Sequence, residues 1–100
     1  MVYTTWKYRV NIVINNPISI EDYQINVTIP YRAHMNSDFS DIRFSDFNGI
    51  ELNYYIQSFV SYVSANVWVK CPINCVLFYL YYGNSLSISN SNFTNTFLQP

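Results

Sequence analysis

The stretch that decides the fold runs from Asn66 to Asn84 and reads Asn-Val-Trp-Val-Lys-Cys-Pro-Ile-Asn-Cys-Val-Leu-Phe-Tyr-Leu-Tyr-Tyr-Gly-Asn. It contains two apolar runs, rich in β-branched and aromatic residues, on either side of a break at residues 72–74. Two such runs around a short break are typical of a β-hairpin. The second run, residues 75–82, is apolar throughout, which favours a strand covered on both faces at the centre of a β-sandwich.

Outward from this stretch, apolar and polar residues alternate with the period of half-buried strands in residues 6–15, 23–31 and 50–59. A shorter strand is expected at residues 41–46, followed by a type I′ turn at Asn48-Gly49. No segment shows the apolar recurrence of an amphipathic helix. The expected fold is therefore all-β: one domain over residues 1–100, an antiparallel two-sheet β-sandwich, jelly-roll or immunoglobulin-like, of six to seven strands. Residues 85–100 would form a polar tail or a last strand leading to a neighbouring module.

The composition limits the classes of function. Of the 100 residues 19% are aromatic and only 11% charged, against a typical charged share of about 25%. The net charge of −1 gives no basic surface for nucleic acid, and no segment reaches the roughly 20 apolar residues of a membrane span. The 13 Asn and 11 Ser favour an extracellular or virion setting. The first residues do not resemble a signal peptide, so we expect a processed protein or one module of a longer chain.

The two cysteines, Cys71 and Cys75, flank the predicted turn. On paired strands their Cα atoms would approach the separation that a disulfide requires, so we expect a disulfide. Two reduced, half-buried thiols are the alternative. A Cys-x3-Cys pair with one distant histidine is poor spacing for zinc, and we expect no metal and no cofactor.

Catalytic and calcium sites have little support. His34, the sole histidine, lies in a predicted loop without the nucleophile and orienting acid that a hydrolase needs. We therefore expect a solvated loop residue and no enzymatic activity. Four acidic residues would cap turns or lie at the surface, with calcium binding as the functional alternative: Asp38, Asp41, Asp46 and Glu51.

Two aromatic residues and two sequons suggest surface roles. Trp68 and Tyr55 each lie on the strand face opposite to their apolar neighbours. If that face is exposed, its rings form a flat platform for a sugar or a protein; a covering domain or subunit is the alternative. Asn26-Val-Thr28 and Asn92-Phe-Thr94 match the N-glycosylation pattern, which also arises by chance in an Asn-rich chain.

Several blocks together resemble a known family over residues 6–84. They include Asp41-Ile-Arg-Phe44, Tyr54-Tyr-Ile56 and Val67-Trp-Val-Lys70, and further residues at matching positions: Trp6, Tyr8, Arg9, Tyr23, Gln24, Met35, Asp46, Gly49, Pro72 and Leu80-Tyr-Tyr-Gly-Asn84. In their order and spacing they are similar to the domain-of-unknown-function family 2341. The resemblance implies a β-sandwich module of bacterial and archaeal surface proteins, often beside lectin-like sandwiches, with no established catalytic role.

The chain departs from this family at two places. Gln57 stands where members usually carry an acid, and the turn at residues 72–74 is shorter than theirs and lacks glycine. We expect a non-catalytic extracellular or cell-surface module for binding or adhesion, whose partner is a glycan or a protein surface. The alternative is a structural subunit of a surface filament or virion that assembles through strand edges and aromatic faces. Neither role involves nucleic acid or membrane insertion.

Overall fold

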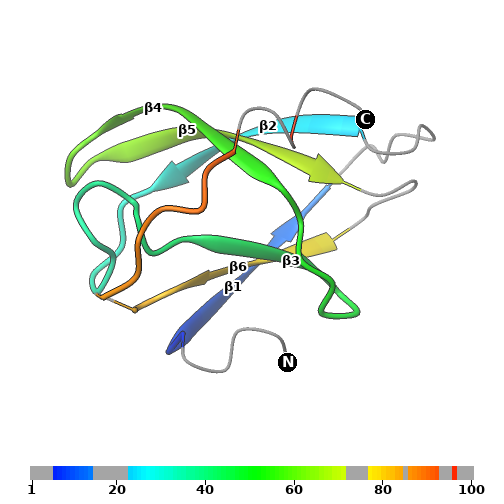
Figure 1. Cartoon of the computed structure of the whole chain (residues 1–100), viewed down its shortest axis with the longest axis horizontal. Helices are drawn as coiled ribbons and strands as arrows, with labels where there is room; N and C mark the ends of the chain where they lie inside the picture. Colours follow the sequence, from blue (N-terminus) through cyan, green and yellow to red (C-terminus); the bar gives the residue numbers. More distant parts are fainter. Residues whose placement is uncertain (1–5, 15–22, 72–76, 85, 93–95, 97–100) are drawn as a thin grey trace.

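The structure is a computed structural model that describes residues 6–14, 23–71, 77–84, 86–92 and 96. Its described elements are six strands: β1 (Tyr8–Val13), β2 (Tyr23–Pro30), β3 (Arg43–Asp46), β4 (Tyr54–Val60), β5 (Ser64–Cys71) and β6 (Leu77–Tyr82). They form two antiparallel sheets of three strands, in the orders β1-β6-β3 and β2-β5-β4. The sheets lie one above the other (Figure 1). The prediction of an all-β, two-sheet sandwich is confirmed.

The core lies between the two sheets and consists of the inward-facing apolar side chains of the strands. In β5 every second residue is buried, since Ala65, Val67, Val69 and Cys71 face inward. Phe44 of β3 makes edge-to-face ring contacts with Tyr54 of β4 and Phe78 of β6, so one ring links both sheets. Such pairs add about 0.5–1.5 kcal/mol each beyond their buried area. Aromatic side chains thus join the two sheets at the centre of the core.

The predicted hairpin around residues 72–74 is wrong. β5 and β6 belong to different sheets, and each is the central strand of its own sheet. A central strand uses both of its edges, β5 with β2 and β4, and β6 with β1 and β3. The two most apolar strands therefore face each other across the core, and neither has an edge left for the other. Only β4 and β5 are both consecutive and paired.

The turn after β3 occurs where predicted but with a different geometry. Gly49 has a φ of +85°, whereas Asn48 is not among the residues with positive φ, so the turn is not type I′. The Asp46 carboxylate accepts hydrogen bonds from the backbone N–H groups of Asn48 and Ile50 instead. After a single bridge between Ser45 and Glu51, the chain crosses to the other sheet and β4 begins. The expected strand at residues 50–59 is therefore shorter, and Ile50 is exposed.

The segment after β6 lies along the β3–β4 side of the sandwich. The Arg43 guanidinium donates to the Ile88 carbonyl at 2.7 Å, the Ser91 hydroxyl accepts from the Ile56 N–H at 2.8 Å, and the Asn92 N–H donates to the Tyr54 carbonyl at 2.7 Å. These bonds cover the sheet edges on that side (Figure 1). On the opposite side, β1 and β2 are the outermost described strands of their sheets.

Candidate functional site

The outer face of the β2-β5-β4 sheet brings the predicted platform residues together. Trp68 of β5 pairs directly with Tyr55 of β4 on one side and with Asn26 of β2 on the other. Both rings are half-buried, so neither is sealed in the core. Side chains opposite one another in antiparallel strands lie about 4.5–5.5 Å apart at Cβ. The strand parity therefore predicted this row of side chains.

A β-bulge in β4 lies at Gln57, a residue that the alternation of the sequence also places on the face of Tyr55. The register shifts between Ile56 and Ser58, and Gln57 is the extra residue. Bulges redirect side chains and are common at functional sites. The Gln57 Oε1 accepts from the Trp68 indole N–H at 2.8 Å and from the Asn66 side-chain amide at 3.2 Å. The bulge therefore fixes the orientation of the indole on the open face.

A line of amide groups crosses all three strands beside the indole. The Asn26 amide donates to the Asn66 Oδ1 at 2.6 Å, and Asn66 donates in turn to Gln57. Two polar atoms have no hydrogen bond within the described part of the chain, namely the Gln57 Nε2 donor and the Asn26 Oδ1 acceptor. The face thus offers ring surface on its central strand, with one donor on β4 and one acceptor on β2.

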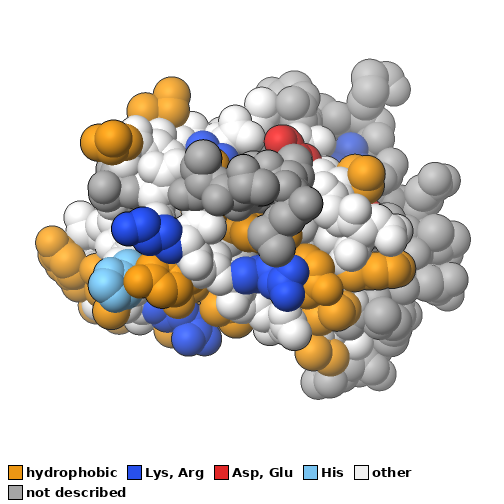
Figure 2. All heavy atoms as spheres, turned by 90° about the horizontal axis from the view of Figure 1, so that it is seen from below, with side chains coloured by type: hydrophobic (Ala, Val, Ile, Leu, Met, Phe, Trp, Pro, Cys, Tyr) orange, Lys and Arg blue, Asp and Glu red, His pale blue; other side chains and the backbone are white. Residues whose placement is uncertain are grey.

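The outer face of the other sheet is arranged differently. Arg9 of β1 lies over the Tyr79 ring at 4.2 Å, and the Tyr81 ring is buried with its hydroxyl bonded to Ser45. Figure 2 shows this side of the molecule, where basic side chains are scattered among apolar ones. The aromatic rings here are thus occupied by the chain's own side chains.

The remaining predicted site residues do not converge. Asp38 caps the Ser40 N–H, the Asp46 carboxylate holds its own turn, and Glu51 is exposed. Hydrogen bonds from Ser40 lower the pKa of Asp38 below its ordinary value. Among the described residues no group of three His, Cys, Asp or Glu side chains is placed to hold a metal. Within the same residues, no helix has the length and apolar character to span a membrane.

The covalent predictions remain predictions. Cys71 is buried at the end of β5, and Cys75 lies outside the described residues, so the disulfide is not addressed. Asn26 and Asn92 are both exposed, as a glycosylation acceptor must be, while Thr94 lies outside the described residues. A glycan on Asn26 would stand directly beside Trp68.

A family model described as "Domain of unknown function (DUF2341)" matches residues 38–99, more than half of the chain. The chain belongs to this family. Comparison with curated proteins and with solved structures found no match. The resemblance noted in the sequence is thereby confirmed, although the matched region begins after the blocks at Trp6, Tyr23 and Met35.

Several motif residues of this DUF2341 domain bind the chain's own backbone. The Asp41 carboxylate is fully buried and accepts from the N–H groups of Asn36 at 3.0 Å, Gly83 at 3.0 Å and Asn84 at 3.3 Å. Arg43 donates to the carbonyls of Ser40, Ile42 and Ile88 and to the Tyr54 hydroxyl. These two side chains tie the loop before β3 to the segment after β6.

A polar cavity of about 390 Å³ opens beside this tie, at the start of β1. Tyr8 stacks between His34 at 4.9 Å and Tyr82 at 5.1 Å, measured between ring centroids. His34 is exposed in its loop, as predicted, but it has a φ of +79° and lines this cavity. Lys7 and Gly83 line it as well. The loop sequence alone gave no signal of the ring stack, which depends on a residue of β1.

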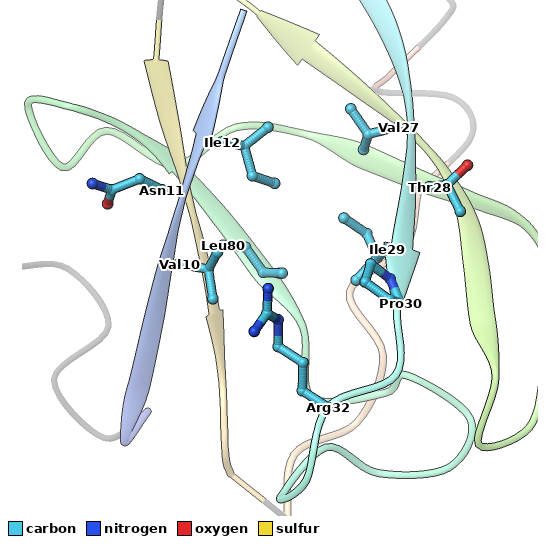
Figure 3. Close-up of a pocket in the computed structure, with 9 residues that line it drawn as sticks. All are labelled: Val10, Asn11, Ile12, Val27, Thr28, Ile29, Pro30, Arg32 and Leu80. Carbon is cyan, nitrogen blue, oxygen red and sulfur yellow. The ribbon is translucent and has the colours of Figure 1, made fainter.

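A second, apolar cleft of about 350 Å³ lies between β1 and β2 on the side of the sandwich opposite to the β3–β4 edges. Figure 3 shows aliphatic side chains from both strands pointing into it, while Asn11 and Thr28 point away. Arg32, just after β2, directs its guanidinium into the same space. Nothing in the sequence singles out Arg32, because an arginine in a loop is ordinarily solvated.

Proposed function

We propose that this DUF2341 domain is a non-catalytic, extracellular binding module that holds a neutral glycan on the outer face of its β2-β5-β4 sheet. The observation that supports this most is the row formed by Asn26, Trp68 and Tyr55, with Gln57 fixing the indole. Sugars present an apolar ring face edged with hydroxyl groups. A half-exposed aromatic residue flanked by amides is complementary to both features.

Binding would proceed with little reorganisation. The indole stacks on the apolar face of one sugar ring, while the Gln57 Nε2 donates to one hydroxyl and the Asn26 Oδ1 accepts from another. Because Gln57 already holds the indole at 2.8 Å, less side-chain entropy is lost on binding, which is how preorganisation improves affinity. The groups that would contact the sugar, the indole and the two amides, are uncharged, which favours a neutral ligand, although Lys70 lies on the same face of β5.

A glycan array followed by NMR titration of the best neutral oligosaccharide tests the proposal. Trp68→Ala should abolish the signal, and Gln57→Leu should weaken it, since it removes both the donor and the bond to the indole. Phe47→Ala is the matched control, because it removes an exposed ring from the β3–β4 turn. If the array shows no neutral glycan, or if Trp68→Ala and Phe47→Ala bind alike, the proposal is wrong.

The second candidate function is assembly into a surface filament or virion. It rests on the tip of the β4–β5 hairpin, which exposes four large apolar side chains: Phe59, Val60, Tyr62 and Val63. Contiguous exposed apolar surface marks interaction sites, and β1 and β2 each have an outer edge that no described strand pairs with. Light scattering over a concentration series separates the two candidates. Growth that Val60→Asp abolishes supports assembly, whereas a monomer at all concentrations contradicts it.

A further inference from the structure

The cleft between β1 and β2 is an opening toward the core that the described residues do not cover. The opposite side of the sandwich is closed by residues 86–92, which bond to β3 and β4. On the open side, Val10, Ile12 and Val27 face inward yet are only half-buried. With Ile29 and Leu80 they form two aliphatic walls (Figure 3). The cleft is thus an apolar slot whose length follows the two strands.

Arg32 gives this slot a charged end. In Figure 3 its guanidinium lies beside Val10 and Leu80 and points into the space between the strands. Within the described part of the chain, the guanidinium of this exposed residue has no hydrogen bond or ionic partner. Only backbone groups of Arg32 are engaged: its N–H bonds to the Met35 sulfur, and its carbonyl accepts from the Met35 N–H. The other described arginines differ, because Arg43 donates four hydrogen bonds and Arg9 lies over a ring.

No carboxylate lines the cleft to neutralise Arg32. Its lining residues are apolar or uncharged apart from this arginine. A guanidinium matches a carboxylate with two parallel hydrogen bonds, which a single ammonium group does not provide. The volume falls within the range of about 300–1,000 Å³ that is usual for small-molecule sites, and mostly apolar walls with one placed polar group are also usual.

We propose that the cleft binds a single aliphatic chain that carries a carboxylate head group, with the chain between the walls of β1 and β2 and the carboxylate on Arg32. The charge of Arg32 favours this occupant over an uncharged chain, and the inward aliphatic side chains favour it over a small hydrophilic anion. The site lies between the sheets, so it is independent of the proposed glycan face. Trp68→Ala should leave it unchanged.

Titration calorimetry with octanoate, decanoate and dodecanoate below their critical micelle concentrations tests the proposal. Burying one methylene gains about 0.8 kcal/mol, which corresponds to a fourfold gain in affinity. Each step of two methylenes should therefore tighten binding by roughly 15-fold until the cleft is full. Decyltrimethylammonium, which has the same chain and the opposite charge, should not bind saturably. Methyl NMR shifts should move at Val10, Ile12, Val27 and Ile29.

Two variants separate the head group from the chain. Arg32→Gln should lower decanoate affinity at least tenfold and leave the chain-length dependence, whereas Val27→Thr should weaken the longer chains most. Arg9→Gln removes the same charge from the outer face of β1 and is the matched control, expected to bind as the unaltered protein does. The proposal is overturned by equal binding of both decyl ions, by wild-type affinity in Arg32→Gln, or by shifts outside the cleft. If the protein dimerises without decanoate and the methyl groups of the cleft are buried in the dimer, the proposal is also overturned, since the occupant of the cleft would then be a second copy.

Discussion

Gly83→Ala should destabilise the domain far more than the same substitution at Gly49. Both glycines have a positive φ, +93° at Gly83 and +85° at Gly49. A Cβ at Gly49 would meet no atom within 4 Å, whereas at Gly83 it would lie 2.5 Å from Cδ2 and 3.0 Å from Cε2 of Tyr8. The pair therefore separates backbone strain, which both variants share, from steric overlap, which only one has.

The magnitudes follow from these two effects. A left-handed conformation costs a residue with a Cβ about 1–2 kcal/mol, and overpacking adds about 1–3 kcal/mol. Tyr8 is partly exposed, but its ring stacks on His34 and Tyr82, so tilting it away would break these contacts. We expect a loss of about 1–2 kcal/mol in the free energy of unfolding for Gly49→Ala and about 2–5 kcal/mol for Gly83→Ala. Domains of this kind have total stabilities of about 5–15 kcal/mol.

Urea unfolding followed by tryptophan fluorescence measures both losses, and a double-mutant cycle identifies their cause. In a Tyr8→Ala background, Gly83→Ala should cost only what Gly49→Ala costs, since the overlapping ring is gone. The difference is the interaction energy between residues 8 and 83, expected at about 1–3 kcal/mol. Equal losses for the two glycines, or an unchanged cost of Gly83→Ala without Tyr8, would refute the steric argument.

Three further predictions concern the ties around β3. Asp41→Asn keeps the shape but directs a donor amide at backbone N–H groups, and it should cost about 2–4 kcal/mol in urea unfolding; a loss no larger than that of the exposed Glu51→Gln would contradict the role of the carboxylate. Arg43→Lys retains the charge but not the four hydrogen bonds, so residues 86–92 should be held less tightly and hydrogen exchange at Ile88 should become faster. Unchanged exchange would show that other contacts hold these residues. Burial raises the pKa of Tyr54, so the unfolded state ionises first and stability should fall as the pH rises above about 10. Tyr54→Phe should reduce this loss of stability at high pH. An equally large loss in the variant would show that other tyrosines cause it.

The strands were predictable because alternation is a local property. The segments expected at residues 23–31 and 66–71 correspond to β2 (Tyr23–Pro30) and β5 (Ser64–Cys71) within two residues. The strand pairing was not predictable in the same way. Whether β5 and β6 pair with each other depends on which strands take their edges, and those strands, such as β1 and β2, are far away in sequence.

In the candidate site, too, some features follow from local alternation and others depend on contacts between distant parts of the sequence. Strand parity placed Trp68 and Tyr55 on one outer face, and their pairing across β4 and β5 follows that parity. The same alternation placed Gln57 on that face, but it gave no signal of the bulge or of the bond from the Trp68 indole to Gln57. Arg32 was missed, because its position in the cleft depends on β1 and β2 belonging to different sheets, which no local pattern encodes.

The motif residues and the proposed ligand contacts are largely different residues. Asp41 and Arg43 bind backbone groups of the chain itself, and Gly83 leaves the space that the Tyr8 ring occupies. Their polar atoms are thus used in holding the loop before β3 against the end of β6, and the motif specifies a scaffold. Trp68 is an exception, since it belongs to the motif and also lies on the open face. Its partner Gln57 is uncharged, and a carboxylate at this position would present a charged acceptor beside the same ring and select a different ligand.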